Sequence, residues 1–159
     1  MPVDTLELAQ AAAITLTAAH AGLVSNSILV VNAFTHSPTI ETVKIWRRVY
    51  LRGKPINLVV AATSCSLWSY LAYHTPDQRT SRLYASCAAI IPACIAFFLV
   101  IQKPVDINLM ETANSDKTDP ARIRRLFDRW YKMAAVRAAI LGTAAVTGIW
   151  ATISKPRAP

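Results

Sequence analysis

Four stretches of the chain are apolar or small at nearly every position, and each has about the length of a membrane span. They cover residues 6–34, 56–73, 83–101 and 131–154. A helix needs roughly 20 apolar residues to cross the hydrocarbon core of a bilayer. Several polar side chains within the spans require neighbouring helices, and short connections favour antiparallel neighbours. The pattern predicts an all-α fold, a transmembrane antiparallel four-helix bundle formed by a single domain over residues 1–159.

The connection after the first span has a helical pattern of its own. Its apolar residues recur at i, i+3, i+6 and i+7, with basic residues opposite them: Val43, Trp46, Val49 and Tyr50. This spacing predicts an additional interfacial amphipathic helix, with its aromatic rings at headgroup depth. Gly53 and Pro55 are expected to end it.

Other helix boundaries follow from the prolines. Pro38 is expected to end the first helix, and Pro92 to kink the third span and free a carbonyl near Ala88. Asp119 before Pro120 has the pattern of an N-cap followed by proline at the first helical position.

Composition supports a membrane protein. Hydrophobic residues make up 53% of the chain, charged residues only 16%, and the mean hydropathy is +0.33. The net charge of +8 does not indicate nucleic-acid binding, because the basic residues form no nucleic-acid motif and lie between apolar segments. The lipid bilayer is therefore the expected partner, with anionic headgroups near the basic connections.

The distribution of basic residues predicts an orientation. Twelve of the 17 Lys and Arg residues lie in the first and third connections. Positively charged connections remain on the cytosolic side. We therefore expect an integral membrane protein with both termini away from the cytosol. The expected membrane is that of the endoplasmic reticulum, with the termini in its lumen.

Motifs for several kinds of chemistry are absent from the sequence. The three cysteines lie in apolar segments without a CxxC pair or ligand spacing, so no metal site is expected. No hydrolase, nucleotide-binding or metalloprotease motif occurs, and the acidic residues lie in connections or near span ends. A proton-coupled transporter would be expected to place an acidic group inside a span.

Two polar side chains at membrane depth are candidates for function. Arg137, near the start of the fourth span, is costly unless it faces a bundle interior, pairs with another group or snorkels to the headgroups. It shares a helical face with Trp130 and with mostly small residues, as if something packs against it. His20 is the one group at this depth that exchanges a proton near neutral pH. A histidine hydrogen-bonded within the bundle is the structural alternative.

Several segments together resemble a known family. They are Gly22-x-x-Ser25, IWRRVYLRGKP from Ile45, PVDINLM from Pro104 and RWYKMAAVRAAILGTAAVTGIWA from Arg129. The chain resembles the anthrone oxygenase-like family of small four-span membrane proteins, whose fungal members act in aromatic polyketide pathways. Asp106 stands where that family has asparagine.

The resemblance implies oxidation of an anthrone to an anthraquinone by molecular oxygen, without a cofactor or metal. It implies a lipophilic aromatic substrate and a site built from the polar and aromatic groups of the spans. In the corresponding hypothesis, His20 removes the C–H proton, while Arg137 and Asn108 stabilise the enolate oxygen. The substrate-binding residues are expected to be Trp68 and Trp130 as flat apolar walls, together with Asn26 and Asp106.

Two other functions remain open. A non-catalytic membrane scaffold or partner protein would fill its bundle completely with small residues. A membrane cyclase or isomerase acting on a lipophilic metabolite would use the same histidine for proton transfer. The oxygenase and the cyclase both require His20 and Arg137 to face one cavity, in a monomer or an oligomer.

Overall fold

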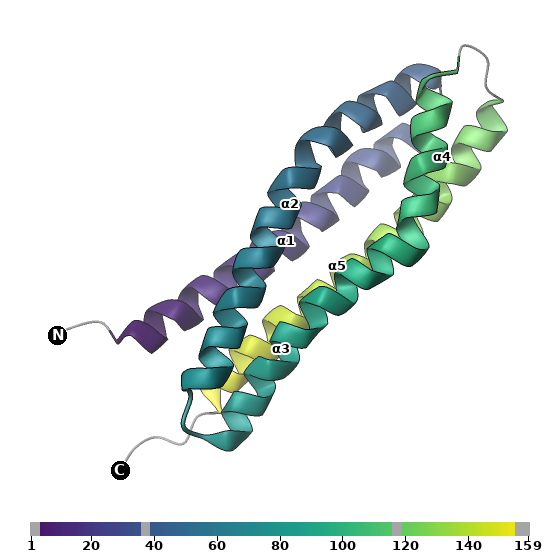
Figure 1. Cartoon of the computed structure of the whole chain (residues 1–159). Helices are drawn as coiled ribbons and strands as arrows, with labels where there is room; N and C mark the ends of the chain where they lie inside the picture. Colours follow the sequence, from purple (N-terminus) through teal and green to yellow (C-terminus); the bar gives the residue numbers. More distant parts are fainter. Residues whose placement is uncertain (1–3, 36–38, 116–118, 155–159) are drawn as a thin grey trace.

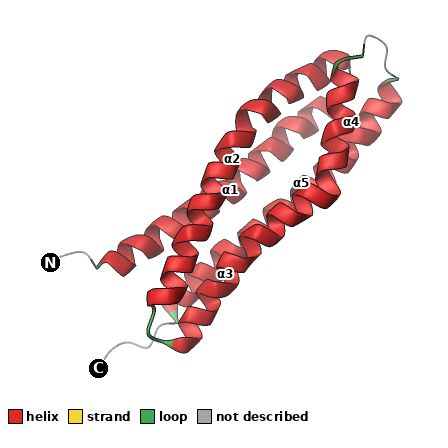
Figure 2. Ribbon diagram, viewed as in Figure 1, coloured by secondary structure: helices red, strands yellow, loops and turns green. Residues whose placement is uncertain are grey.

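The chain folds into long helices that run alternately up and down (Figures 1 and 2). The structure is a computed structural model that describes residues 4–35, 39–115 and 119–154. Its elements are α1 (Thr5–Thr35), α2 (Ile40–His74), α3 (Gln78–Phe97), the π-helical turn η1 (Phe98–Gln102), α4 (Lys103–Ala113) and α5 (Pro120–Ile153). Because α3, η1 and α4 follow without a break, the described chain has four helical runs, each long and apolar enough to cross a membrane. The predicted all-α transmembrane bundle is confirmed.

Helix α2 corrects the prediction of a separate interfacial helix. It begins at a capping box in which the Thr39 hydroxyl accepts a hydrogen bond from the Thr42 N–H, and it continues through Gly53 and Pro55 to His74. The amphipathic segment and the second span are therefore one helix of 35 residues. At 1.5 Å per residue this is about 50 Å, longer than the hydrocarbon core of roughly 30 Å. Its first half can therefore extend beyond the apolar layer.

The third span is also longer than predicted, because the helix continues through Pro92 and Pro104 to Ala113. Pro92 has no N–H to donate to Ala88, and the Ala88 carbonyl instead accepts a weak hydrogen bond from the Cys65 thiol at 3.6 Å. The expected free carbonyl thus has a partner on α2. No pattern in the sequence indicates η1, whose five residues lie between the two prolines.

Side-chain caps determine where two helices begin. The Asp119 carboxylate accepts a hydrogen bond from the Ala121 N–H, and Pro120 is the first residue of α5, as predicted. The Asp77 carboxylate caps α3 by accepting from Thr80, whose hydroxyl and backbone N–H hold the pKa of that carboxyl below its usual value. Pro38, the predicted end of the first helix, lies outside the described residues.

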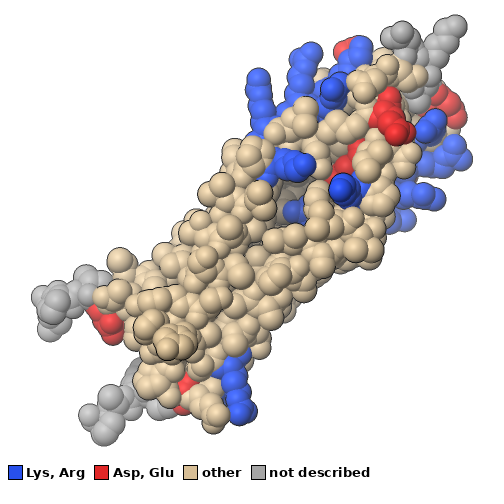
Figure 3. All heavy atoms as spheres, in the orientation of Figure 1, with Lys and Arg blue, Asp and Glu red and all other residues tan. Residues whose placement is uncertain are grey.

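The core has two parts at different levels of the bundle. Towards the α2–α3 connection, small residues and a stacked pair of rings, Trp68 and Tyr84, fill the space between the helices. Towards the other end, larger side chains including Trp46, Phe127 and Trp130 form a second cluster. Figure 3 shows Lys and Arg concentrated at this second end and a hollow beside it. The charge asymmetry is thus present on the folded molecule, while orientation and organelle remain predictions.

Candidate functional site

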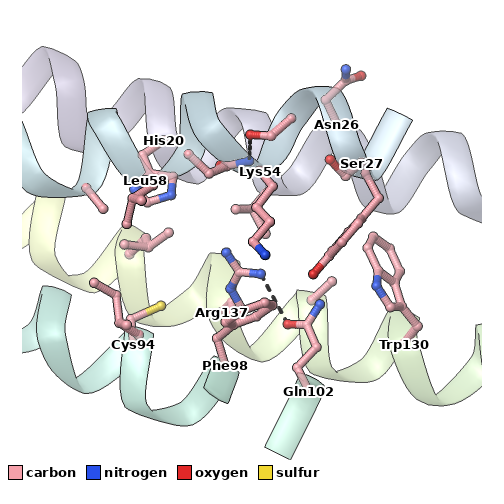
Figure 4. Close-up of a pocket in the computed structure, with 18 of the residues that line it drawn as sticks. His20, Asn26, Ser27, Lys54, Leu58, Cys94, Phe98, Gln102, Trp130 and Arg137 are labelled. Atoms are coloured by element: carbon pink, nitrogen blue, oxygen red, sulfur yellow. Dashed lines mark hydrogen bonds between the residues drawn. The ribbon is translucent and has the colours of Figure 1, made fainter. Parts of the chain in front are cut away.

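A cavity of about 310 Å³ lies between the helices near the basic end of the bundle (Figure 4). Its walls come from α1, α2, the α3–η1 run and α5. Most lining side chains are apolar or aromatic, and a few polar groups point among them. Cavities that bind small molecules have this composition, and their volumes begin at about 300 Å³.

Arg137 of α5 is held by the π-helical turn. Its guanidinium donates a hydrogen bond from Nη1 to the Gln102 Oε1 at 3.2 Å and lies 5.1 Å from the centre of the Phe98 ring. The buried Nε–H has no hydrogen-bond partner among the described residues. Among the described residues, no carboxylate lies within salt-bridge distance of Arg137. The guanidinium is therefore fixed in place while retaining capacity to bind an anion.

His20 of α1 lies on the cavity wall and is only 4% exposed. Neither ring nitrogen forms a hydrogen bond of normal geometry with the described residues, although the Asn57 amide lies close to the ring. The imidazole is also near enough to Arg137 for their charges to interact. A histidine that served only as a packed, hydrogen-bonded core residue would have its ring nitrogens satisfied.

Lys54 of α2 is a second cation of the cavity. It lies one turn before Asn57 on the helix, and Figure 4 shows its ammonium group directed toward Arg137. Both cations act electrostatically on the carboxyl group of Asp106, which lies behind the cavity wall. Two positive groups and one acidic group leave the region with an excess of positive charge when all three are ionised. This surplus favours an anionic ligand or intermediate.

Aromatic rings form the end of the cavity away from His20. Trp46 stacks on Tyr50 with ring centres 5.0 Å apart, and its edge meets Trp130 at 6.2 Å. All three residues line the cavity. The indole nitrogens of Trp46 and Trp130 are buried without a hydrogen-bond partner among the described residues. This end therefore offers flat apolar walls and unused N–H donors.

The structure brings together only part of the predicted site. His20, Asn26, Trp130 and Arg137 line the cavity, with Asn26 exposed at its rim and its amide directed away from Arg137 in Figure 4. Asp106 is 2% exposed and lies next to the cavity without lining it. The expectation that the acidic residues lie in connections or near span ends is wrong for Asp106, because α4 extends the third span beyond this residue.

Asn108 and Trp68 lie elsewhere. Asn108 is exposed, and its amide donates to the Pro104 carbonyl at 2.8 Å within α4. Trp68 is fully buried in the other core cluster, where its indole N–H donates to the Thr17 hydroxyl at 2.9 Å. These positions do not fit the predicted roles in oxyanion stabilisation and in a substrate wall.

Sequence reasoning missed several polar or aromatic groups of the site, among them Tyr50, Lys54, Phe98 and Gln102. A signal for the first two was present, because residues 46, 50, 54, 57 and 61 have the three- and four-residue spacing of one helical face. Ending the helix at Pro55 hid that spacing. Phe98 and Gln102 depend on the π-helical turn, which the hydrophobic pattern does not reveal.

The sequence is similar to known proteins of one family. The family model described as anthrone oxygenase matches residues 46–147, which include the cavity residues of α2, η1 and α5 but not His20. The curated protein anthrone oxygenase encC of Aspergillus fumigatus is 22% identical over 125 residues, which cover 69% of each chain. No solved structure matches the chain. Since the family model covers well over half of the sequence, the chain belongs to the anthrone oxygenase family.

Proposed function

We propose that this protein is a membrane-embedded oxygenase that converts an anthrone-type aromatic polyketide to an anthraquinone with molecular oxygen and without a cofactor. Family membership supports the reaction class, and the named relative supports anthrones as the substrate class. One observation carries the assignment of roles. His20 of α1 and Arg137 of α5 line the same cavity, and both His20 ring nitrogens and the Arg137 Nε are buried without hydrogen-bond partners among the described residues.

The chemistry begins with an acidic C–H bond. An anthrone carries a methylene group opposite its carbonyl in the central ring, and removal of one methylene proton gives an aromatic enolate. His20 accepts this proton as the general base. Arg137, held by Gln102, stabilises the negative charge that develops on the carbonyl oxygen. Gln102 thus supports the group that was expected to act with Asn108.

The enolate is electron-rich enough to reduce oxygen directly. One electron passes from the enolate to O2, and the carbon radical and superoxide combine to give a peroxide at the former methylene carbon. Protonation by the histidinium gives a hydroperoxide. Loss of the second methylene proton then breaks the O–O bond, forms the new carbonyl and releases water. One anthrone and one O2 thereby give one anthraquinone and one water.

The rim of the cavity suits a substrate that arrives from the membrane. Two apolar side chains, Leu58 and Leu99, line the cavity and are more than half exposed. In a bilayer such side chains face lipid. A flat lipophilic ring system can therefore enter laterally and meet the wall formed by Trp46 and Trp130.

Isolated membranes that contain the protein provide the test. Incubation with an anthrone should consume one O2 for each quinone formed, measured with an oxygen electrode and by quinone absorbance. His20→Ala should lower turnover by about 10²- to 10⁴-fold, because it removes the general base. His74→Ala is the matched control, since His74 is exposed at the far end of α2 against Tyr70. Full activity of the His20 variant would contradict the role of that residue, and no quinone from the wild-type protein would contradict the proposed reaction.

A further inference from the structure

The carboxyl group of Asp106 is buried without a hydrogen bond to the described residues. Its residue is 2% exposed, and both carboxyl oxygens are enclosed. An isolated buried polar group costs roughly 1–3 kcal/mol even in favourable cases and more when it is charged. Asp106 therefore needs either a partner that approaches more closely in the working enzyme or a functional reason for its position.

Two cavity residues face this carboxyl group. The Tyr50 hydroxyl and the Trp130 indole N–H are near enough to Asp106 to interact with it, although neither forms a hydrogen bond of normal geometry. Tyr50 is also near enough to Arg137 for their charges to interact. The tyrosine hydroxyl is therefore within interaction range of both the Asp106 carboxyl group and the Arg137 guanidinium.

The Tyr50 ring is held by its neighbours. It stacks on Trp46 with an angle of 24° between the planes, and Trp46 in turn packs edge-on against Trp130. Tyr50 is half-buried and lines the cavity. A tyrosine that only anchored α2 at the membrane surface would need neither a buried carboxyl group behind it nor a place in the cavity wall.

We propose that the Tyr50 hydroxyl is a second hydrogen-bond donor to the enolate oxygen, beside Arg137, and that Asp106 is the positioning residue that orients this hydroxyl. The inference rests on the proposed function, because it assigns a role at the same oxyanion. His20 and the aromatic end lie at opposite ends of the cavity (Figure 4). The methylene carbon of one ring system can therefore face His20 while its carbonyl oxygen faces the aromatic end. In this arrangement Asp106 acts as a neutral carboxylic acid whose own O–H donates to the Tyr50 oxygen, which leaves the single Tyr50 proton for the oxyanion.

Turnover of variants in isolated membranes gives the first test. Tyr50→Phe keeps the ring that stacks on Trp46 and removes only the hydroxyl. It should lower kcat with an anthrone by about 100-fold and change KM much less, since an oxyanion donor acts mainly in the transition state. Asp106→Asn should lower kcat by a smaller factor, about tenfold, because Tyr50 remains but is oriented less well. Tyr73→Phe is the control, since Tyr73 is 85% exposed at the far end of α2.

Naphthols provide a second test that does not depend on turnover. A naphthol presents the phenolate form of a fused ring system without an oxidisable methylene, and its fluorescence distinguishes the neutral from the ionised form. The wild-type protein should bind naphthols of rising acidity with rising affinity and in ionised form. Tyr50→Phe should flatten this dependence, Asp106→Asn should weaken it, and Tyr73→Phe should leave it unchanged.

The two tests separate the inference from the proposed function. A wild-type protein that oxidises anthrones while Tyr50→Phe retains its kcat and its dependence on naphthol acidity would overturn the role of Tyr50. A wild-type protein that does not oxidise anthrones but binds ionised naphthols through Tyr50 would overturn the proposed reaction and support the oxyanion site. Comparable membrane levels and melting temperatures of the variants establish that each loss arises in the site.

Discussion

Gly148 of α5 should not tolerate even an alanine side chain. A Cβ atom at this position would lie 2.2 Å from Cη2 of Trp68, whereas ordinary contact begins at 3.4 Å. The indole and the helix would therefore have to separate by about 1.2 Å. The indole is fully buried, stacks on Tyr84 with ring centres 5.6 Å apart and donates to the Thr17 hydroxyl, so it has little freedom to move.

These contacts set the size of the effect. Forcing an additional methyl group into a filled core costs about 1–3 kcal/mol. Displacing the indole from Thr17 adds the net value of a buried hydrogen bond, about 0.5–1.5 kcal/mol. We expect Gly148→Ala to lower the free energy of unfolding by about 2–4 kcal/mol and the melting temperature in detergent by about 5–15 °C.

Gly142 provides a matched control on the same helix, because a Cβ atom there would meet nothing within 4 Å. Gly142→Ala should be neutral or stabilising by about 0.5–1 kcal/mol, since alanine has the better helix propensity. Melting of both purified variants followed by circular dichroism gives the comparison. If Gly148→Ala melts with Gly142→Ala, then α5 does not pack on Trp68 as described, and Trp68 becomes available again as a substrate wall.

Three further predictions concern the cavity. Lys54→Met should reduce kcat/KM for an anthrone by about tenfold in the oxygen-uptake assay, because one of the two cations of the cavity is lost. Lys103→Met should have no effect in the same assay, because Lys103 does not line the cavity. Gln102→Leu should lower kcat by about tenfold, because it releases the Arg137 guanidinium. Gln102→Glu places a carboxylate on Arg137 and should instead raise the Ki of anionic inhibitors such as naphtholates. Trp68→Phe should cost about 2–3 kcal/mol of stability, because a buried hydrogen bond and part of a buried ring are lost, while leaving turnover per folded molecule unchanged, measured by melting and quinone formation.

Much of the fold follows from the length and polarity of the apolar segments. The four spans, the N-cap at Asp119 and the loss of a hydrogen bond at Ala88 were all predictable, because each depends on local chemistry. The helix end expected at Pro55 was not, since Pro55 lies inside the continuous helix α2. In a membrane bundle, neighbouring helices and side chains compensate the freed carbonyls, so proline interrupts a helix less reliably than in water.

The site was predictable only where placing a single polar side chain within a membrane span costs free energy. His20 and Arg137 stood out because polar side chains within a span need a partner or a function, and both line the cavity. Asn108 and Trp68 were inferred from residue type and family resemblance, and their positions depend on helix register. The i→i+5 hydrogen bonds of η1 shift the helical register around Phe98 and Gln102, which both contact Arg137, and a hydrophobic pattern cannot show this change of register.

The environment of Arg137 explains why its charge can favour the transition state over the substrate. The guanidinium is partly withdrawn from solvent, yet its direct partners among the described residues are a neutral amide and an aromatic ring. A neutral ketone offers it only a weak dipole, whereas an enolate offers a full negative charge in the same place. In the proposed reaction the interaction therefore strengthens as the proton leaves for His20, and only interactions that strengthen in this way accelerate a reaction. A carboxylate paired with Arg137 would have removed this difference, which is why neutral Gln102 is the appropriate partner.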